Sequence, residues 1–236
     1  MEPDEVHAWL KRNGTRRTVA GMARFGIEAR QAYGVTMGQL RGLKKRIGKD
    51  HALAIALWDS GWYEARLLAA LVGEPGRLTR RQMNAWAAGF ENWADCDTAC
   101  FHLFDKSPFA WEKARQWAGS RREFVKRGGF ALMASLALHD KAAADAKFLA
   151  FLPLVEVGAQ DERNFVRKGV SWALRGIGRR NRALHAAALV VARRLSQSAS
   201  PAPRWVGKDA ARELASPKVA ARLARRPPAT GSGRAR

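Results

Sequence analysis

The stretch "TMGQLRGLKKRIG" at residues 36–48 indicates the kind of fold that this chain adopts. Thr36 and Gln39 have the spacing of a capping box, in which two side chains satisfy backbone N–H groups at the start of a helix. Gly48 follows the last apolar residue, at a position where glycine commonly ends a helix. The stretch therefore predicts a short helix over residues 37–47.

Similar signals recur along the rest of the chain. Thr79 and Gln82 have the capping-box spacing. Ser120 and Glu123 repeat it, and Ser107 stands before a proline that suits a first helical turn. Sustained alternation of apolar and polar residues, which marks a half-buried strand, does not occur in the sequence. The expected helices are 4–12, 16–32, 37–47, 50–59, 62–72, 80–90, 93–104, 108–118, 121–139, 144–157, 162–178, 182–197 and 207–225.

Many short helices joined by tight turns are typical of a helical solenoid. Self-similarity between successive segments is weak, so the repeats are expected to be degenerate and of HEAT type. We therefore predict an all-α fold, a curved α-solenoid whose concave face can hold an extended ligand. The expected domains are 1–197 for the helical repeats, 198–226 for a linker and a basic C-terminal helix packed on or near them, and 227–236 for a disordered basic tail.

The charge balance indicates the class of partner. Forty-two Lys and Arg residues stand against twenty-one Asp and Glu residues, which gives a formal net charge of +21. The tail from Pro227 onward holds only two of the arginines, so most of the positive charge lies on folded segments. A polyanion is the expected partner of such a chain, and nucleic acid is the commonest.

The sequence also indicates a compartment. Two cysteines are too few for a disulfide framework, which favours a reducing environment. The first residues, "MEPDEVHAWL", lack a hydrophobic signal core, and no apolar run reaches the length of a membrane span. We expect a cytoplasmic protein without a membrane partner, associated with the nucleoid when it is bound to DNA.

Trp93 and Asp97 lie in the stretch "ENWADCDTAC" and share one face of a predicted helix, because they are four residues apart. An indole attracts a flat cationic ligand. A carboxylate beside it can stabilise positive charge in a transition state or position a water molecule. The alternative is that Asp95 or Asp97 caps the helix and Trp93 belongs to the core, and caps are commoner than active sites. Spacing alone favours this alternative.

Cys96 and Cys100 are also four residues apart, with His102 nearby. A zinc site would need a fourth ligand and usually a closer pair of cysteines. Buried cysteines within a helix are the better interpretation, and we expect no metal.

Residues 164–181 place an aromatic residue among cations. Lys168, Trp172, Arg175 and Arg179 line one face of a predicted helix. Such a strip suits a nucleic-acid duplex, because the cations can contact phosphates. A solvated basic face with Trp172 folded into the core is the alternative, and the pattern alone does not decide between them.

Another basic cluster opens the predicted helix that ends at His139. Arg122, Lys126 and Arg127 crowd its first turns, where cations oppose the helix dipole unless an anion is present. Phosphate binding is therefore one interpretation, and a solvated basic face is the other. Gly129 lies within the same helix, which indicates close approach of a neighbouring helix or of a ligand.

Five segments, in this order, resemble the AlkD-like DNA alkylation-repair glycosylases, a family of HEAT-like repeat DNA glycosylases, and together they cover roughly residues 20 to 195. The order and spacing of the segments are more specific than any one of them. The five segments are "MARFGIEARQAYGVTMGQLRGL" (22–43), "ALWDSGWYEARLLAALV" (56–72), "NWADCD" (92–97), "FVKRGGFAL" (124–132) and "FVRKGVSWALRGIGRRN" (165–181).

The resemblance implies a solenoid that wraps double-stranded DNA and hydrolyses the N-glycosidic bond of cationic alkylated purines, such as 3-methyladenine or 7-methylguanine. It implies a monofunctional enzyme without metal or cofactor that leaves an abasic site. The matching positions assign catalysis to Trp93, Asp97 and Trp172, and phosphate contacts to Arg127 and Arg175. A monomer is expected, because a solenoid can wrap a duplex without a second subunit.

The chain departs from the resembling family at two positions. Ala94 follows the first tryptophan where members often have Asp, and Phe25 stands where members can carry a tyrosine. Some relatives bind DNA structures without excising bases. A non-catalytic HEAT-like protein selective for branched or distorted DNA is therefore the alternative function.

Overall fold

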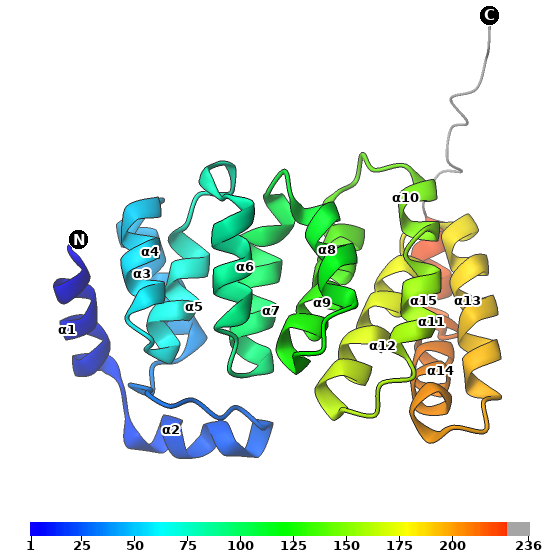
Figure 1. Ribbon diagram of the computed structural model, residues 1–236, viewed down its shortest axis with the longest axis horizontal. Coiled ribbons are helices and arrows are strands. Elements are labelled where there is room, and N and C mark those ends of the chain that lie inside the picture. The colour runs from blue at the N-terminus through cyan, green and yellow to red at the C-terminus, as the bar shows by residue number, and fades with distance from the viewer. Residues whose placement is uncertain (226–236) are drawn as a thin grey trace, which may run out of the picture. The chain divides into compact units, whose positions relative to one another are not determined.

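The computed structural model describes residues 1–225 and divides into two compact units, Met1–Lys113 and a second that begins at Ala114 (Figure 1). Every regular element within the described residues is a helix, which confirms the predicted all-α class. Short turns connect most of the successive helices in each unit.

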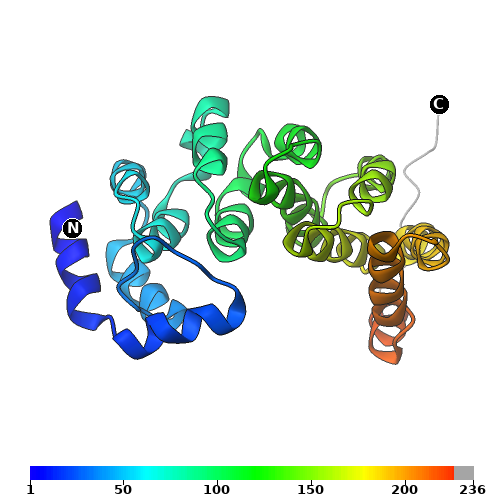
Figure 2. The same cartoon turned by 60° about the horizontal axis from the view of Figure 1, so that its bottom comes forward.

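Unit 1 is built from α1 to α7, and in Figure 1 α2 runs across the bottom of the unit, transverse to the other helices (Figures 1 and 2). α5 is the central helix of the unit and packs against α3, α4 and α7. The bounds are α1 Pro3–Asn13, α2 Arg16–Met22, α3 Met37–Ile47, α4 His51–Asp59, α5 Tyr63–Val72, α6 Arg80–Ala88 and α7 Trp93–His102, with 3-10 turns η1 Ala23–Phe25, η2 Pro75–Arg77 and η3 Phe104–Lys106. α8 (Ala110–Ala118) spans the boundary between the units.

Unit 2 is organised around α12. This helix packs against α9, α13 and α14, and α14 packs in turn against α13. The bounds are α9 Glu123–His139, α10 Asp145–Leu149, α11 Leu152–Gly158, α12 Asn164–Gly178, α13 Arg182–Ser196, α14 Pro201–Leu214 and α15 Pro217–Ala224.

Local sequence signals placed several helix ends correctly. The reciprocal bonds between Thr36 and Gln39 are present at the start of α3, and Gly48 ends that helix with a φ of 80°. The Thr79 side chain caps α6 by accepting from the backbone N–H of Gln82. Gly129 confirms the expected close approach, because an added Cβ would lie 2.4 Å from the backbone nitrogen of Ala118.

The predicted helix 16–32 is wrong. The helix ends at Met22, and after the 3-10 turn the chain leaves the helical path at Gly26, whose φ of 64° lies in the left-handed region. Glycine adopts that conformation readily because it has no Cβ. Residues 26–36 form no regular helix or strand.

A carboxylate holds part of this irregular segment in place. Glu64 on α5 is completely buried and accepts hydrogen bonds from three successive backbone N–H groups. The donors are Tyr33 at 2.8 Å, Gly34 at 2.7 Å and Val35 at 3.2 Å. Buried backbone donors need partners, so one side chain replaces the hydrogen bonds that a helix would have supplied.

Two helix starts in unit 2 differ from the prediction. Ser120 and Glu123 form no capping box, because the N-cap residue of α9 is Arg122 rather than Ser120. Ser120 Oγ instead accepts a hydrogen bond from the Arg122 N–H at 3.1 Å. Arg122 therefore precedes the helix rather than opposing its dipole from within. The predicted helix 144–157 is divided into α10 and α11, and Pro153 lies in the first turn of α11.

The linker expected between residue 198 and the predicted helix 207–225 contains the start of α14 at Pro201. A proline in the first helical turn removes an N–H group that would have had no partner within the helix. The predicted helix 207–225 is instead the rest of α14 followed by α15, with Ser216 capping α15. The predicted disordered tail, 227–236, lies outside the described residues.

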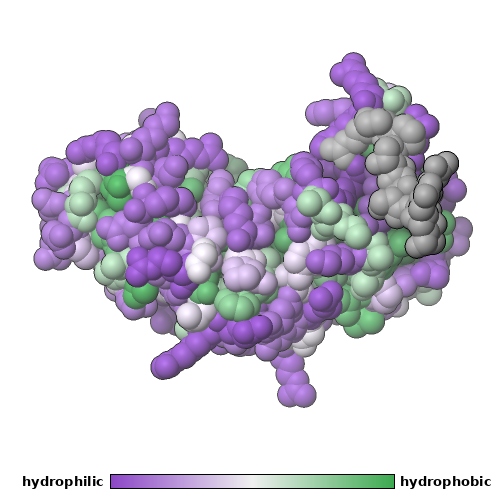
Figure 3. All heavy atoms as spheres, turned by 90° about the horizontal axis from the view of Figure 1, so that it is seen from above, coloured by the Kyte–Doolittle hydropathy of each residue, from purple (hydrophilic) through white to green (hydrophobic). Residues whose placement is uncertain are grey.

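Hydrophilic side chains cover most of the face that Figure 3 shows, interrupted by scattered apolar residues. Across residues 1–225, none of the helices combines the length and the apolar character that crossing a lipid bilayer requires.

Candidate functional site

The N-terminus of α7 is fixed by a capping box. The Asn92 side chain accepts from the backbone N–H groups of Ala94 at 2.9 Å and Asp95 at 3.1 Å. Asp95 returns the interaction by accepting from the Asn92 N–H at 3.3 Å, and it is only 2% exposed. The capping alternative raised by the sequence therefore applies to Asp95 and not to Asp97.

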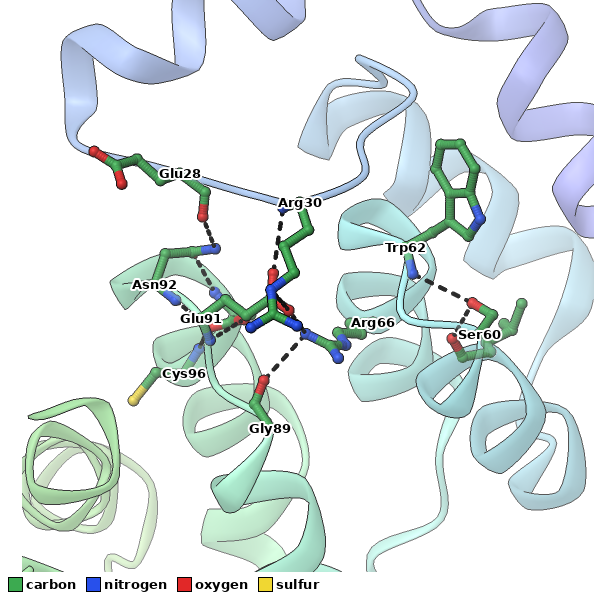
Figure 4. A network of polar contacts seen from close by, with 11 residues as sticks. Glu28, Arg30, Ser60, Trp62, Arg66, Gly89, Glu91, Asn92 and Cys96 are labelled. Atoms are coloured by element: carbon green, nitrogen blue, oxygen red, sulfur yellow. Dashed lines mark hydrogen bonds and ion pairs between the residues drawn. The ribbon is translucent and has the colours of Figure 1, made fainter. Parts of the chain in front are cut away.

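A polar network joins this helix start to the irregular segment 26–36 (Figure 4). Asn92 Nδ2 donates to the Glu28 carbonyl at 3.2 Å. Glu91 forms ion pairs with Arg66 at 3.2 Å and with Arg30 at 3.8 Å. Side chains from α5 and from the irregular segment thus converge on the residues that precede α7.

Asp95 is the most deeply buried acid of this network. Burial raises the pKa of Asp95 to about 7, against the opposing effect of backbone hydrogen bonds from Glu91, Asn92 and Cys96 and of the Arg66 charge. An exposed Asp has a pKa of about 3.9. The carboxyl group of Asp95 therefore stays protonated in the folded chain at acidic pH values where an exposed Asp is already ionised.

We expect the free energy of unfolding to fall as the pH rises from about 4 to about 7. The folded state binds the Asp95 proton in that window and the unfolded chain does not, so rising pH favours unfolding. The measurement is urea unfolding of the wild type and of Asp95→Asn at several pH values. The difference in free energy of unfolding between the wild type and Asp95→Asn should shrink as the pH rises. A difference that grew with pH would contradict the raised pKa of Asp95.

Trp93 and Asp97 share one face of α7, and both side chains are half-buried. The indole Nε1 of Trp93 donates to the Phe25 carbonyl at 2.9 Å, which holds the plane of the ring. Phe25 itself is 69% exposed. Trp93 is therefore accessible at its surface rather than sealed in the core, and Asp97 lies outside the capping box.

Cys96 and Cys100 are free thiols and fully buried, which confirms their interpretation as buried helix cysteines. Within residues 1–225, no group of three or more His, Cys, Asp or Glu side chains is arranged to hold a metal ion.

α12 carries the predicted basic strip of unit 2. Lys168 is exposed, and Trp172 and Arg175 are half-buried along the same face. Arg179, also half-buried, is the C-cap residue directly after the helix. The opposite face is in the core, where five apolar side chains are fully buried. These five are Val166, Val170, Ala173, Leu174 and Ile177.

Two carboxylates of α14 lie on this strip. Glu213 forms ion pairs with Arg175 and, at 2.9 Å, with Arg179. Asp209 lies 3.7 Å from Arg175 and accepts a hydrogen bond of 2.6 Å from Ser171 Oγ. Neither acid was predicted as part of the strip, although both lie four residues apart within a predicted helix, which places them on one face.

The cations near the start of α9 differ in their surroundings. Arg127 is 6% exposed, and its guanidinium donates to the Phe165 carbonyl at 2.6 Å. Lys126 pairs with Asp161 at 2.9 Å. Arg122 has an exposed side chain. The first two therefore hold α9 to neighbouring backbone and acid groups, and Arg122 meets solvent.

Comparisons with known proteins agree on the family and the fold. A family model described as "DNA alkylation repair enzyme" matches residues 6–214. An uncharacterized protein of Listeria innocua, Lin0241, is 26% identical over 101 residues, which are 42% of this chain and 45% of that protein. The chain thus spans less than half the length of this curated relative.

A solved structure shares the fold at a TM-score of 0.75 and 20% identity, covering 91% of this chain and 96% of the other. It is described as representing a new family of proteins related to the HEAT-like repeat DNA glycosylases with affinity for branched DNA structures. The fold of this chain is therefore an all-α solenoid of HEAT-like repeats, as predicted.

Proposed function

Because the chain belongs to the DNA alkylation repair enzyme family, we propose that it is a DNA glycosylase acting on cationic alkylated purines in duplex DNA. The observation that carries this proposal is the shared face of Trp93 and Asp97 on α7. Asn92 and Asp95 cap the helix, so Asp97 is not needed for capping. A half-buried carboxylate beside a half-buried indole suits a flat cationic substrate.

The reaction is hydrolysis of the bond between the purine and C1′ of deoxyribose. Alkylation gives the purine a positive charge, so it departs with the bonding electrons as a neutral base and needs no general acid. Positive charge then develops on the sugar, where the Asp97 carboxylate stabilises it. Water adds to C1′ and loses a proton, which leaves an abasic site.

The tryptophans account for selectivity in this proposal. Indole faces attract cations, so Trp93 and Trp172 favour charged lesions over neutral bases. The hydrogen bond from Trp93 to the Phe25 carbonyl fixes one of the two rings. Neutral lesions should therefore react poorly.

Duplex DNA is the proposed partner, and the basic residues of unit 2 are the proposed phosphate contacts. Lys168 and Arg122 are exposed and can meet phosphates directly. The other four are also proposed phosphate contacts, and they would share their ion-pair or hydrogen-bond partners with phosphates or exchange them. They are Lys126, Arg127, Arg175 and Arg179.

The test of the proposal is an incubation with two duplexes of the same sequence. One carries 7-methylguanine and the other carries uracil, a neutral lesion. We expect free 7-methylguanine and an abasic site from the first, and no base from the second. Equal release from both would contradict a mechanism based on cationic substrates.

A second candidate function is non-catalytic binding of branched DNA. The observation that favours it is the solved structure with a TM-score of 0.75, whose family is described as having affinity for branched DNA structures. Tighter binding to a four-way junction than to a linear duplex, together with no base release, would support this function over the first.

We expect Glu213→Gln to strengthen binding to linear duplex DNA. The substitution removes the only carboxylate paired with Arg179 in the described residues and one of the two that pair with Arg175, since Asp209 stays near Arg175. Each recovered phosphate contact should steepen the salt dependence of log K by about 0.9. Fluorescence anisotropy with a labelled duplex over a range of salt concentrations measures this slope.

Glu156→Gln is the matched control for that variant. It removes the same charge from an acid that pairs with Arg194 on α13, outside the strip of α12. Equal changes in DNA affinity and salt slope in the two variants would show an effect of net charge alone. That result would contradict a specific role for Glu213.

A further inference from the structure

A basic pocket of about 630 Å³ lies in unit 1 and plays no part in the proposed excision site. Five of its eight lining residues are Lys or Arg, and none is Asp or Glu. The five cations are Arg41, Lys44, Lys45, Lys49 and Lys106, and we call this site the basic pocket.

The basic pocket is remote from Trp93. It lies where α3, α5 and α7 end, and the lining residues Leu71 and His102 belong to the last turns of α5 and α7. These ends are at the top of unit 1 in Figure 1 and face the viewer in Figure 3. Trp93 begins α7 and His102 ends it, and nine residue steps of an α-helix span about 14 Å.

The positive charge of the basic pocket exceeds what the helix ends require. Cations near a helix C-terminus offset its dipole, which amounts to about half a negative charge. Three helices end here, so their dipoles together amount to about −1.5 against five cations. Lys106 also pairs with Asp105 at 3.6 Å, which leaves four cations against the helix dipoles. The positive charge of the pocket therefore still exceeds what the helix ends require.

Two ammonium groups are held in position. Lys49 Nζ donates to the backbone carbonyls of Leu71 at 3.1 Å and Gly73 at 2.7 Å. Lys106 Nζ donates to the His102 carbonyl at 3.1 Å. An ammonium has three donors, so Lys49 keeps the capacity to donate to an anionic ligand.

The cations of the basic pocket also repel one another. Burial lowers the pKa of Lys49, and the charges of Lys44 and Lys106 lower it further, while Glu74 raises it. A bound anion would relieve this repulsion, since it interacts favourably with every cation of the group.

We propose that the basic pocket binds phosphates of the DNA backbone, as a second contact remote from Trp93 and Asp97. The proposal takes DNA as the partner from the proposed function, and it does not depend on base excision. Small nucleotides are usually held by helix N-termini and backbone N–H groups. Here the C-terminal ends of helices line the site, and most of its cations are lysines, which act as point charges. Such charges suit the phosphates of an extended polyanion.

The test compares two double variants that each remove two cations from the last turn of a helix. Lys44→Gln with Lys45→Gln alters the basic pocket at the end of α3. Lys11→Gln with Arg12→Gln removes the same charge from the last turn of α1 and leaves the pocket intact. Binding is measured by anisotropy with an unmethylated duplex of about 20 base pairs, roughly 70 Å long, over a range of salt concentrations.

We expect the pocket variant to bind the duplex roughly tenfold more weakly or worse, with a salt slope reduced by about 1.8, while the α1 variant changes much less. Equal losses in the two variants, or no loss in the pocket variant, would overturn the proposal. Because unmethylated duplex is the probe, the result is independent of whether the protein excises bases.

A thermal-stability measurement with inorganic triphosphate separates DNA phosphates from a free small ligand. Under the proposal, triphosphate stabilises the wild type weakly and competes with DNA. If triphosphate stabilised the wild type strongly and the pocket variant bound DNA as the wild type does, the pocket would be a site for a small polyphosphate. That outcome would also overturn the proposal.

Discussion

Replacing Asp97 by Asn is expected to slow the release of 7-methylguanine from methylated duplex DNA by roughly 10²–10³-fold. The amide has the shape of the carboxylate but lacks the charge that stabilises the cationic sugar. Binding of the duplex should persist, because the cations proposed to contact phosphates are unchanged in this variant. Single-turnover kinetics with enzyme in excess separates the chemical step from binding.

Asp59→Asn is the matched control for this variant. Asp59 is exposed at the end of α4, in the same unit as Asp97, and loses the same charge. It should release the base at the rate of the wild type. A rate for Asp97→Asn within a few-fold of the control would remove Asp97 from the mechanism.

Glu64→Leu is expected to lower the melting temperature by roughly 10 °C or more. Leucine cannot accept hydrogen bonds, so the N–H groups of Tyr33, Gly34 and Val35 lose their partner. Each unsatisfied buried donor costs about 1–3 kcal/mol, and a chain of this size loses about 2–4 °C per kcal/mol. Thermal unfolding followed by circular dichroism measures the shift.

Glu64→Gln distinguishes lost hydrogen bonds from a lost charge. Oε1 accepts from Gly34 and Val35, and glutamine retains one such oxygen, so only the bond from Tyr33 to Oε2 must be lost. Its melting temperature should lie between those of the wild type and Glu64→Leu. A leucine variant as stable as the wild type would show that the irregular segment does not depend on Glu64.

Signals close in sequence predicted the helices well. Both bounds of α3 follow from Thr36, Gln39 and Gly48, because capping and termination act within one turn. The predicted helix 16–32 failed because the chain turns away at Gly26, and the residues beyond it are held by distant groups: Glu91 accepts from the Arg30 N–H, and Asn92 donates to the Glu28 carbonyl. Local propensity cannot register such a partner.

At the candidate site, too, features set by nearby residues were predictable and features set by tertiary contacts were not. Spacing placed Trp93 and Asp97 on one face of a helix, and the capping role of Asp95 was left open until the bonds to Asn92 were seen. The pairing of Arg175 with Glu213 is a tertiary contact between α12 and α14. Its carboxylate was visible in the sequence, but its position on the basic strip was not.

Analysis of the free bases that the wild-type protein releases from methylated duplex DNA decides whether it is a glycosylase. We expect 7-methylguanine or 3-methyladenine in the soluble fraction, with an equal number of abasic sites in the duplex. If the protein bound the same duplex and released no purine, the glycosylase proposal would be contradicted, and a DNA-binding protein on a HEAT-like scaffold would remain.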